Sequence, residues 1–432
     1  MEFIAQPGGG VSGTLRVPGD KSISHRCIMF GAIADGVTTV EGFLEGEDAL
    51  STIKAFRAMG VQIDGPDNGK VSIHGVGRDG LSAPADELYV GNSGTSMRLL
   101  AGLLAGQAFD TVLTGDVSLS KRPMERVAVP LREMGAKVET QQGGRPPMLI
   151  RGGQRLRGID YVLPMASAQV KSCVLLAGLY ADGETRTTEP APTRDHSERM
   201  LQGFGYPVKV DGATASLEGG HRLQAVHIDV PADISSAAFF MVAASITPGA
   251  DLTLEHVGIN PTRIGVVNIL RAMGGNIELL NERDVGGEPV ADIRVRYAPL
   301  SGIDIPEDQV PLAIDEFPVL FVAAACAEGR TVLRGAEELR VKESDRIQVM
   351  ADGLASMGIQ AEATADGIII DGGQITGGRV NSHHDHRIAM SFAVAALRAT
   401  DTIYIEDCDN VATSFPNFVE LAQRAGMLLE VG

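Results

Sequence analysis

A string of cationic and hydroxyl side chains, PGDKSISHR at residues 18–26, lies near the start of the chain. Gly19 lets the backbone approach a ligand closely, and the free N–H groups at a helix start bind anions. Lys21 adds a point charge, and Arg26 adds a planar two-pronged donor. We expect a loop that holds phosphate or carboxylate, followed by a helix over residues 27–34. The alternative is a solvated turn that binds nothing.

Two strings further along the chain have the same character. GNSGTSMR at residues 91–98 reads as a glycine-rich loop before an apolar helix, with Gly94 open to a ligand. In SLSKRP at 118–123, Pro123 keeps Arg122 out of a helix. The alternative for residues 91–98 is a capped helix without a ligand. The alternative for residues 118–123 is a solvated Lys-Arg pair.

Side chains that could carry acid–base chemistry follow. Asp315 precedes an apolar helix, and among cations it could act as a general base; alone, it would only favour the helix dipole. In VKESDR at 341–346, Glu343 stands between Lys342 and Arg346, which are four apart and can share one helix face. Such a charged run also suits a solvated face.

The string at residues 164–172 begins an apolar helix that we expect to run to Tyr180, and Ser167 and Gln169 can cap it or reach a ligand. The three histidines of HHDHR at 383–387 could indicate a metal site, but their spacing does not suit ligands on one helix. We therefore expect no metal there, and Arg387 joins the other cations. The cationic side chains are Lys21, Arg26, Arg122, Lys342, Arg346 and Arg387. If they converge, they would suit two polyanionic substrates held between two domains.

Composition narrows the possible partners. The 432 residues include 37 basic and 55 acidic side chains, so the formal net charge is −18. This balance argues against nucleic acid or an anionic membrane as a partner. The 4 cysteines are far apart and the N-terminus lacks a secretory signal, which together indicate the cytoplasm. The longest apolar run, residues 317–327, is far shorter than the ~18 residues that span a membrane.

The elements that position these strings repeat along the chain. A helical segment ends at a glycine and leads into a short strand, with the closing glycines at 60, 135, 205, 274, 358 and 426. A spacing of roughly 70 residues is too long for a solenoid unit and suits a small α/β module. Strings near 17–22 and 230–236 resemble each other. We take them as crossovers between two halves of three modules each.

Taken in order, PGDKSISHR, GNSGTSMR, SLSKRP, SAQVKS, the Asp315 string, VKESDR and DHRIAM resemble the 5-enolpyruvylshikimate-3-phosphate synthase family over essentially the whole chain. The resemblance implies an α/β fold of two similar domains, each with three βαβαββ units around buried helices. The expected domains are 1–20 with 232–432, and 21–231, with the active site in the cleft between them.

The resemblance also implies the chemistry, a transfer of the enolpyruvyl group from phosphoenolpyruvate to the 5-hydroxyl of shikimate 3-phosphate without metal or organic cofactor. The catalytic residues would be Asp315, Glu343 and Lys21. Shikimate 3-phosphate would be bound by Lys21, Ser22, Arg26, Ser167, Gln169, Arg194, Asp315 and Lys342. Phosphoenolpyruvate would be bound by Lys21, Gly94, Arg122, Gln169, Arg346 and Arg387. We expect a cytoplasmic monomer.

Two other functions stay open on the sequence. A UDP-N-acetylglucosamine enolpyruvyl transferase would share fold and co-substrate, but that family has a reactive cysteine in the loop matching residues 116–122, where this chain has none. A non-catalytic anion-binding protein would not need both Asp315 and Glu343. Some family members carry a lysine before the terminal Phe-Pro; residues 412–414 lack it, and other strings resemble the glyphosate-tolerant subgroup.

Overall fold

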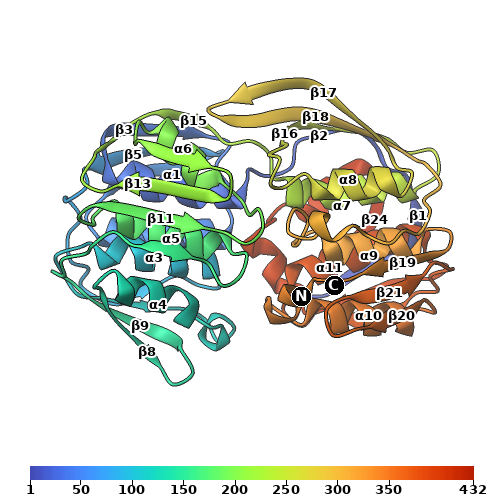
Figure 1. The fold of residues 1–432 in the computed structure, drawn as a ribbon. Helices are drawn as coiled ribbons and strands as arrows, with labels where there is room; N and C mark the ends of the chain where they lie inside the picture. The colour runs from blue at the N-terminus through green and yellow to red at the C-terminus, as the bar shows by residue number, and fades with distance from the viewer. The chain divides into compact units, whose positions relative to one another are not determined.

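A computed structural model describes residues 1–432, which form twelve α-helices, five short 3-10 helices and twenty-four strands (Figure 1). The chain divides into two compact units. Unit 1 comprises Met1–Pro18 and Pro231–Gly432, and unit 2 comprises Gly19–Val230. Each has its own apolar core. The α/β class expected from the sequence is confirmed.

Unit 2 contains three consecutive modules. The first is α1 (Lys21–Ile33), β3 (Ala34–Glu41), α2 (Glu47–Ala58), β4 (Gln62–Asp67) and β5 (Lys70–Val76), joined by β14 (Leu223–Gln224) and β15 (His227–Asp229). The second is β6 (Leu88–Tyr89), α3 (Gly94–Ala105), β7 (Thr111–Thr114), η1 (Leu119–Lys121), α4 (Glu125–Glu133), β8 (Lys137–Gln141) and β9 (Arg145–Arg151). The third is β10 (Asp160–Val162), α5 (Ala168–Gly178), β11 (Glu184–Thr188), α6 (His196–Gly203), β12 (Val208–Asp211) and β13 (Thr214–Glu218).

Unit 1 repeats the plan. Its first module is β2 (Ser12–Leu15), α7 (Ile234–Ile246), β16 (Asp251–Gly258), α8 (Gly265–Ala272), β17 (Asn276–Val285) and β18 (Glu288–Arg296). Its second is η2 (Glu307–Gln309), α9 (Phe317–Ala325), β19 (Arg330–Leu333), η3 (Glu337–Val341), α10 (Arg346–Ser356), β20 (Gln360–Ala363) and β21 (Ile368–Asp371). Its third is β22 (Gly378–Asn381), α11 (His386–Ala395), η4 (Ala396–Arg398), β23 (Ile403–Glu406), η5 (Asp409–Thr413), α12 (Phe418–Ala425), β24 (Met427–Val431) and β1 (Phe3–Gly9).

Each module folds into one small sheet with the same strand order. An edge strand pairs in parallel with its neighbour, as β6 does with β7, and the next two strands are antiparallel, as β9 and β8 are. In the module of β19 the parallel edge is reduced to two isolated bridges, Ser301 with Glu328 and Asp304 with Val332. The N-terminal strand β1 lies between β23 and β24 and so completes the sixth module.

The closing glycines end the outer helices as expected. Gly60, Gly135, Gly205, Gly274, Gly358 and Gly426 all have positive φ, from 79° to 107°, in the left-handed region where a side chain would be strained. A second device, missed in the sequence, supports five of these turns. The side chain three residues before the glycine donates to the carbonyl three residues after it, as Arg271 does to Ile277 O at 2.9 Å. Arg57, Arg132, Gln202 and Gln423 do the same.

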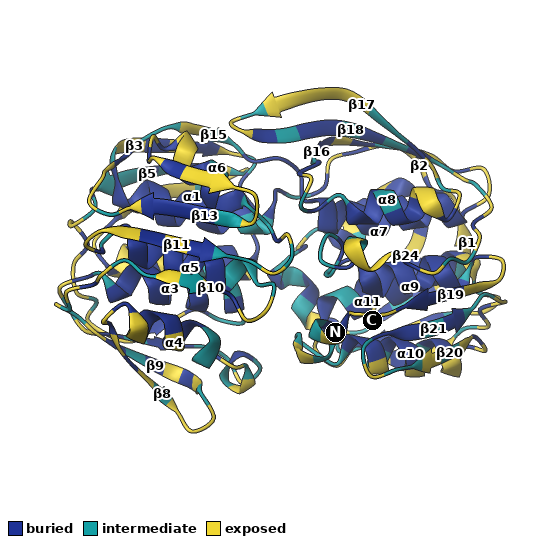
Figure 2. Ribbon diagram, viewed as in Figure 1, coloured by how far each residue is buried: buried dark blue, intermediate teal, exposed yellow.

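The inner helices are buried around their whole circumference. All residues of α7 and of α9 are buried, and in α1 everything from Ile23 onward is buried. Figure 2 shows these helices in dark blue along most of their length. In unit 1, α7, α9 and α11 pack against one another, and in unit 2, α3 packs against both α1 and α5. Polar side chains therefore concentrate at the helix ends.

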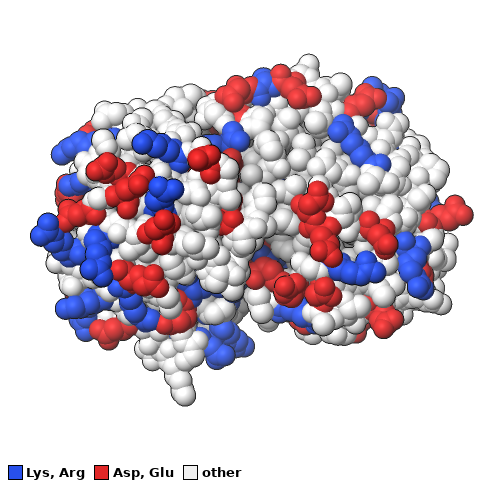
Figure 3. Space-filling model, in the orientation of Figure 1, with Lys and Arg blue, Asp and Glu red and all other residues white.

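The surface carries both signs of charge. On the face shown in Figure 3, Lys and Arg side chains lie among Asp and Glu side chains. None of the helices has the length and apolar character required to cross a membrane.

Candidate active site

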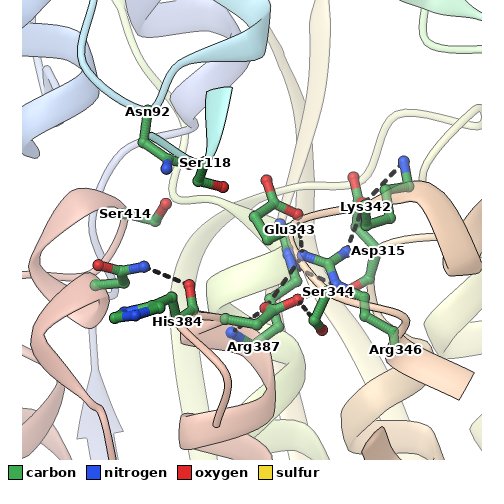
Figure 4. Close-up of polar contacts among 12 residues, drawn as sticks. Asn92, Ser118, Asp315, Lys342, Glu343, Ser344, Arg346, His384, Arg387 and Ser414 are labelled. Carbon is green, nitrogen blue, oxygen red and sulfur yellow. Dashed lines mark hydrogen bonds and ion pairs between the residues drawn. The ribbon is translucent and has the colours of Figure 1, made fainter. Parts of the chain in front are cut away.

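The charged cluster of unit 1 is built around Arg346, the first residue of α10, whose side chain is only 1% exposed. Its guanidinium contacts three carboxylates: Nε lies 2.8 Å from Asp385 Oδ2, Nη2 lies 2.7 Å from Glu343 Oε2, and Nη1 lies 3.2 Å from Asp315 Oδ1. Lys342 Nζ lies 3.5 Å from the same Asp315 oxygen. Figure 4 shows this arrangement, with the guanidinium between Asp315 and Glu343. Cations and potential acid–base groups thus share one small cluster.

Burial and charge act in opposite directions on Arg346. Burial alone would lower the pKa of its guanidinium, but the carboxylates of Asp385, Glu343 and Asp315 outweigh it and raise the pKa above the ordinary value. The side chain therefore stays charged under all conditions in which the protein is folded. A permanently charged, planar donor is suited to hold a carboxylate or phosphate.

A second cation of unit 1 stands at the start of α11. Arg387 Nη1 donates to the backbone carbonyl of Asp315 at 2.9 Å and lies 3.9 Å from the buried Glu316 carboxylate. Glu316 in turn accepts from Ser235 at the start of α7, and Ser235 accepts from Arg263 at 2.6 Å. The N-termini of α7, α9 and α11 therefore meet through their polar side chains.

In unit 2, the first turns of α1 supply the cations. Asp20 caps the helix by accepting from Ile23 N at 2.8 Å, so Lys21 is the first helical residue. Lys21 Nζ is paired with Asp48 of α2. The buried Arg26 donates to the carbonyl of Ser22 at 2.9 Å.

Arg26 is also fixed by two hydroxyls from other helices of unit 2. Its Nε lies 2.8 Å from Ser197 Oγ of α6, and its Nη2 lies 2.9 Å from Ser172 Oγ of α5. The two hydroxyls are themselves 2.7 Å apart. These contacts fix the orientation of the guanidinium inside unit 2.

The loop before α3 gathers the remaining unit 2 candidates. Arg122 Nη2 donates to Asn92 Oδ1 at 2.6 Å, and Gln169 Nε2 donates to Thr95 Oγ1 at 3.0 Å. Arg98 donates to Gln169 Oε1 from the opposite side.

Gly94, the first residue of α3, lies against two of these cations. A Cβ added there would stand 3.1 Å from Nη1 of Arg98 and 3.3 Å from Nη1 of Arg122. The glycine therefore leaves room beside two guanidinium groups.

The structure corrects two local expectations. The segment 21–26 is not a loop before a helix, because Lys21, Ser22 and Arg26 already lie in α1, which spans Lys21–Ile33. Lys342 and Arg346 do not share a helix face, because Lys342 precedes α10 and only Arg346 belongs to it. Both still reach Asp315, through tertiary contact rather than helical spacing.

The other candidates lie as follows. Ser167 caps α5 and accepts from Val170 N at 3.4 Å. Arg194 precedes α6, whose Ser197 reaches Arg26. The histidine string forms the turn into α11, with His384 Nδ1 2.7 Å from Asp407 Oδ1 and the buried His386 as the first helical residue.

Sequence reasoning missed Asp48, Asn92, Arg98 and Asp385 as members of these clusters. Arg98 could have been found, since it stands four residues after Gly94 on the same helix. Asp48 and Asn92 gave no signal of their own, because only the tertiary fold brings them to Lys21 and Arg122.

Permanently charged guanidiniums beside carboxylates, at the N-termini of buried helices, define an acid–base enzyme for small anionic substrates. A family model for EPSP synthase (3-phosphoshikimate 1-carboxyvinyltransferase) matches residues 5–421. The chain belongs to the EPSP synthase family. The likeness extends over whole chains.

The 3-phosphoshikimate 1-carboxyvinyltransferase of Methylococcus capsulatus is 66% identical over 429 residues, covering 99% of this chain and 98% of that protein. The enzyme of the same name from Alkalilimnicola ehrlichii is 67% identical over 433 residues, covering 100% and 97%. Among solved structures, EPSP synthase from Acinetobacter baumannii matches with a TM-score of 0.91 and 63% identity, covering 100% of this chain and 99% of that one.

Proposed function

We propose that this protein transfers the 1-carboxyvinyl group of phosphoenolpyruvate to the 5-hydroxyl of shikimate 3-phosphate and releases phosphate. The observation that carries the proposal is the cluster of Arg346, Lys342, Asp315 and Glu343, which combines fixed cations with two carboxylates. Full-length relatives at 66% and 67% identity that carry this activity support it.

The reaction balances as an addition followed by an elimination. The hydroxyl oxygen bonds to C2 of phosphoenolpyruvate while C3 gains a proton, which gives a tetrahedral intermediate. Loss of phosphate from C2 and of a proton from C3 then restores the double bond. Two groups must therefore handle protons, one at the hydroxyl and one at C3.

Asp315 and Glu343 are proposed for these two tasks. Asp315 Oδ1 lies between Lys342 and Arg346, so it would accept the hydroxyl proton where cations already surround the reacting groups. Glu343 would deliver the proton to C3 and remove one later. Acid–base catalysis of this kind contributes about 10²–10⁴-fold to the rate.

The cations are proposed to bind the substrates. Arg346 and Arg387 would hold phosphoenolpyruvate together with Lys21, Arg122, Gln169 and the open position at Gly94. Shikimate 3-phosphate would be bound by Lys21, Ser22, Arg26, Ser167, Gln169, Arg194, Asp315 and Lys342. Fixed donors aimed at developing negative charge are usually the largest single catalytic contribution.

This assignment requires the cations of both units to serve one reaction. The unit bounds of Gly19–Val230 and its complement are compatible with the proposed domains, 1–20 with 232–432 and 21–231. Solution scattering with and without shikimate 3-phosphate tests the arrangement, because closure around substrate would lower the radius of gyration. Unchanged dimensions with saturating substrates would count against it.

One assay separates the candidate activities. Phosphate release from phosphoenolpyruvate should depend on shikimate 3-phosphate and should be absent with UDP-N-acetylglucosamine. Release only with the nucleotide sugar would replace the proposal by the related transferase. If phosphoenolpyruvate and shikimate 3-phosphate both bind but phosphate is released with neither acceptor, the protein is a binding protein.

Glu343→Gln tests the acid–base assignment with little change in shape. We expect turnover to fall by about 10²–10⁴-fold, and solvent deuterium to stop entering C3 of phosphoenolpyruvate. Glu337→Gln, on the neighbouring η3 segment, is the matched control and should keep wild-type turnover. Deuterium incorporation that persists in Glu343→Gln would remove Glu343 from this role.

Three finer points are part of the proposal. The protein is a cytoplasmic monomer, which light scattering of the purified chain and cell fractionation test. It belongs to the glyphosate-tolerant subgroup, because residues 412–414 lack a lysine and the strings at 167–171, 194–198 and 260–263 resemble that subgroup. Its tolerance is intermediate, because no methyl group at Gly94 crowds the inhibitor. A glyphosate inhibition constant far below the KM for phosphoenolpyruvate would reject that placement.

A further inference from the structure

A buried ring of side-chain hydrogen bonds in unit 2 has no part in the assignment above. His25 of α1, Thr52 of α2, and Ser93 and Ser96 at the start of α3 are all buried. His25 Nδ1 lies 2.8 Å from Thr52 Oγ1, Thr52 Oγ1 lies 2.7 Å from Ser96 Oγ, and Ser96 Oγ donates to Ser93 Oγ at 2.8 Å. Ser93 Oγ lies 3.5 Å from His25 Nε2, which closes the circle.

The direction of donation around the ring follows from the α3 cap. Ser93 Oγ accepts from the backbone N–H of Ser96 at 3.0 Å and from the Ser96 hydroxyl, so its own proton points to His25 Nε2. Ser96 then accepts from Thr52, and Thr52 accepts from His25 Nδ1–H. With this direction of donation, a neutral imidazole with its proton on Nδ1 satisfies the four links. Nδ1 also lies 3.2 Å from Ser96 Oγ, and the Thr52 hydroxyl lies 3.4 Å from the Asp48 carbonyl. Burial lowers the pKa of His25 well below its usual range, and the charges of Lys21 and Arg26 add to that effect.

We propose that this ring is a positioning device that fixes the loop before α3, and through it the phosphoenolpyruvate ligands Arg122 and Gln169. The ring members alternate with residues that hold those ligands. Asn92, next to Ser93, binds Arg122, and Thr95, next to Ser96, binds Gln169. Thr52 is one turn after Asp48, the partner of Lys21. Side-chain hydrogen bonds in a closed buried circuit rigidify the groups they join.

The inference rests on the proposed function for its kinetic consequence but not for its structural one. Thr52→Val keeps the shape of the side chain and opens two links. If positioning contributes about the free energy of one hydrogen bond to binding, its loss should raise the KM for phosphoenolpyruvate about tenfold. The KM for shikimate 3-phosphate should change less than twofold, and Thr52→Ser should restore the wild-type value. Ser96→Ala opens the ring at another link and should give the same split.

Thr185→Val is the matched control. Thr185 is equally buried in unit 2, and its hydroxyl has no hydrogen-bond partner, so neither KM should change. If Thr52→Val and Ser96→Ala raise both KM values alike, or neither, the positioning role is refuted even though the enzyme is active. A wild-type protein with no activity would instead refute the proposed function.

The ring itself has a readout that does not depend on activity. Nitrogen-15 NMR of the imidazoles, assigned with a His25→Gln variant, should show a neutral His25 with its proton on Nδ1. That signal should change in Thr52→Val and not in Thr185→Val. A His25 with the proton on Nε2, or one that titrates near pH 6.5, would overturn the ring.

Discussion

Asp385→Asn is the perturbation that tests whether the unit 1 cluster is held together by charge. The Asp385 carboxylate is fully buried, and its Oδ2 accepts from Arg346 Nε at 2.8 Å and from Ser344 Oγ at 3.0 Å. Its Oδ1 accepts from Arg387 N at 3.0 Å and from Arg346 Nη2 at 3.3 Å. An asparagine offers one oxygen where the aspartate offers two.

The magnitude follows from which contacts survive. The asparagine oxygen can keep the α11 cap on Arg387 N, since Asn caps helices as well as Asp does. Its amide N–H groups then face the donor Nε of Arg346, which is 1% exposed. Removing one partner of a buried ion pair costs about 3–5 kcal/mol. Because Asp315 and Glu343 still contact the guanidinium, we expect the lower end, a loss of about 3 kcal/mol in the free energy of unfolding.

Urea unfolding followed by circular dichroism measures this loss, since the chain has no tryptophan to report by fluorescence. Hydrogen exchange by mass spectrometry locates it, and protection should fall in α10 and α11. Asp371→Asn is the control: it makes the same change in a bidentate pair with Arg330, both bonds at 2.8 Å, on the exposed surface of unit 1. We expect a much smaller loss there, because water screens an exposed ion pair. Equal losses for the two variants would refute the charge argument.

Three other changes have expected outcomes. In the module of α10, Ala355 stands where the other modules have an Arg or Gln that donates across the closing glycine. Ala355→Arg supplies that donor and should stabilise the protein by about 0.5–1 kcal/mol, seen as a higher Tm; an unchanged or lower Tm contradicts this. His25 is neutral in the fold because its pKa is lowered, whereas in the unfolded chain it binds a proton below about pH 6.5. Lowering the pH therefore destabilises the fold. Between pH 7.5 and 5.5 the wild type should lose about 1.4 kcal/mol more free energy of unfolding than His25→Gln does. Gly94→Ala places a methyl 3.1 Å from a guanidinium nitrogen and should raise the KM for phosphoenolpyruvate roughly three- to tenfold, leaving that for shikimate 3-phosphate unchanged in steady-state assays.

The repeat was readable in the sequence because its signal is local. An apolar helix that ends at a glycine depends only on side-chain spacing and on the left-handed backbone at that glycine, and all the closing glycines adopt it. The clamp from Arg271 to Ile277 O is equally periodic. It was missed because the sequence does not show which acceptor an exposed arginine three residues before a glycine will contact. The acceptor is a carbonyl of the following strand, and only the fold brings it within reach.

The start of α1 shows where local reasoning fails. His25 and Arg26 are buried, so the first turns of the helix lack the apolar pattern that marks a helix in a sequence. The polar residues there are satisfied by Thr52 and by Ser197, which are 27 and 171 positions away. Site residues that depend on such distant partners, as Lys21 does on Asp48, can be proposed as chemistry from the sequence but not placed.

The three carboxylates around Arg346 differ in what they can do once an anionic substrate arrives. A bound carboxylate or phosphate competes with them, because a guanidinium has only five N–H donors to share. Asp385 is fully buried and also held by Ser344 and the α11 backbone, so it remains and keeps Arg346 oriented. Asp315 and Glu343 are 16% and 21% exposed and can turn away. An anion that approaches Arg346 therefore competes with Asp315 and Glu343 rather than with Asp385.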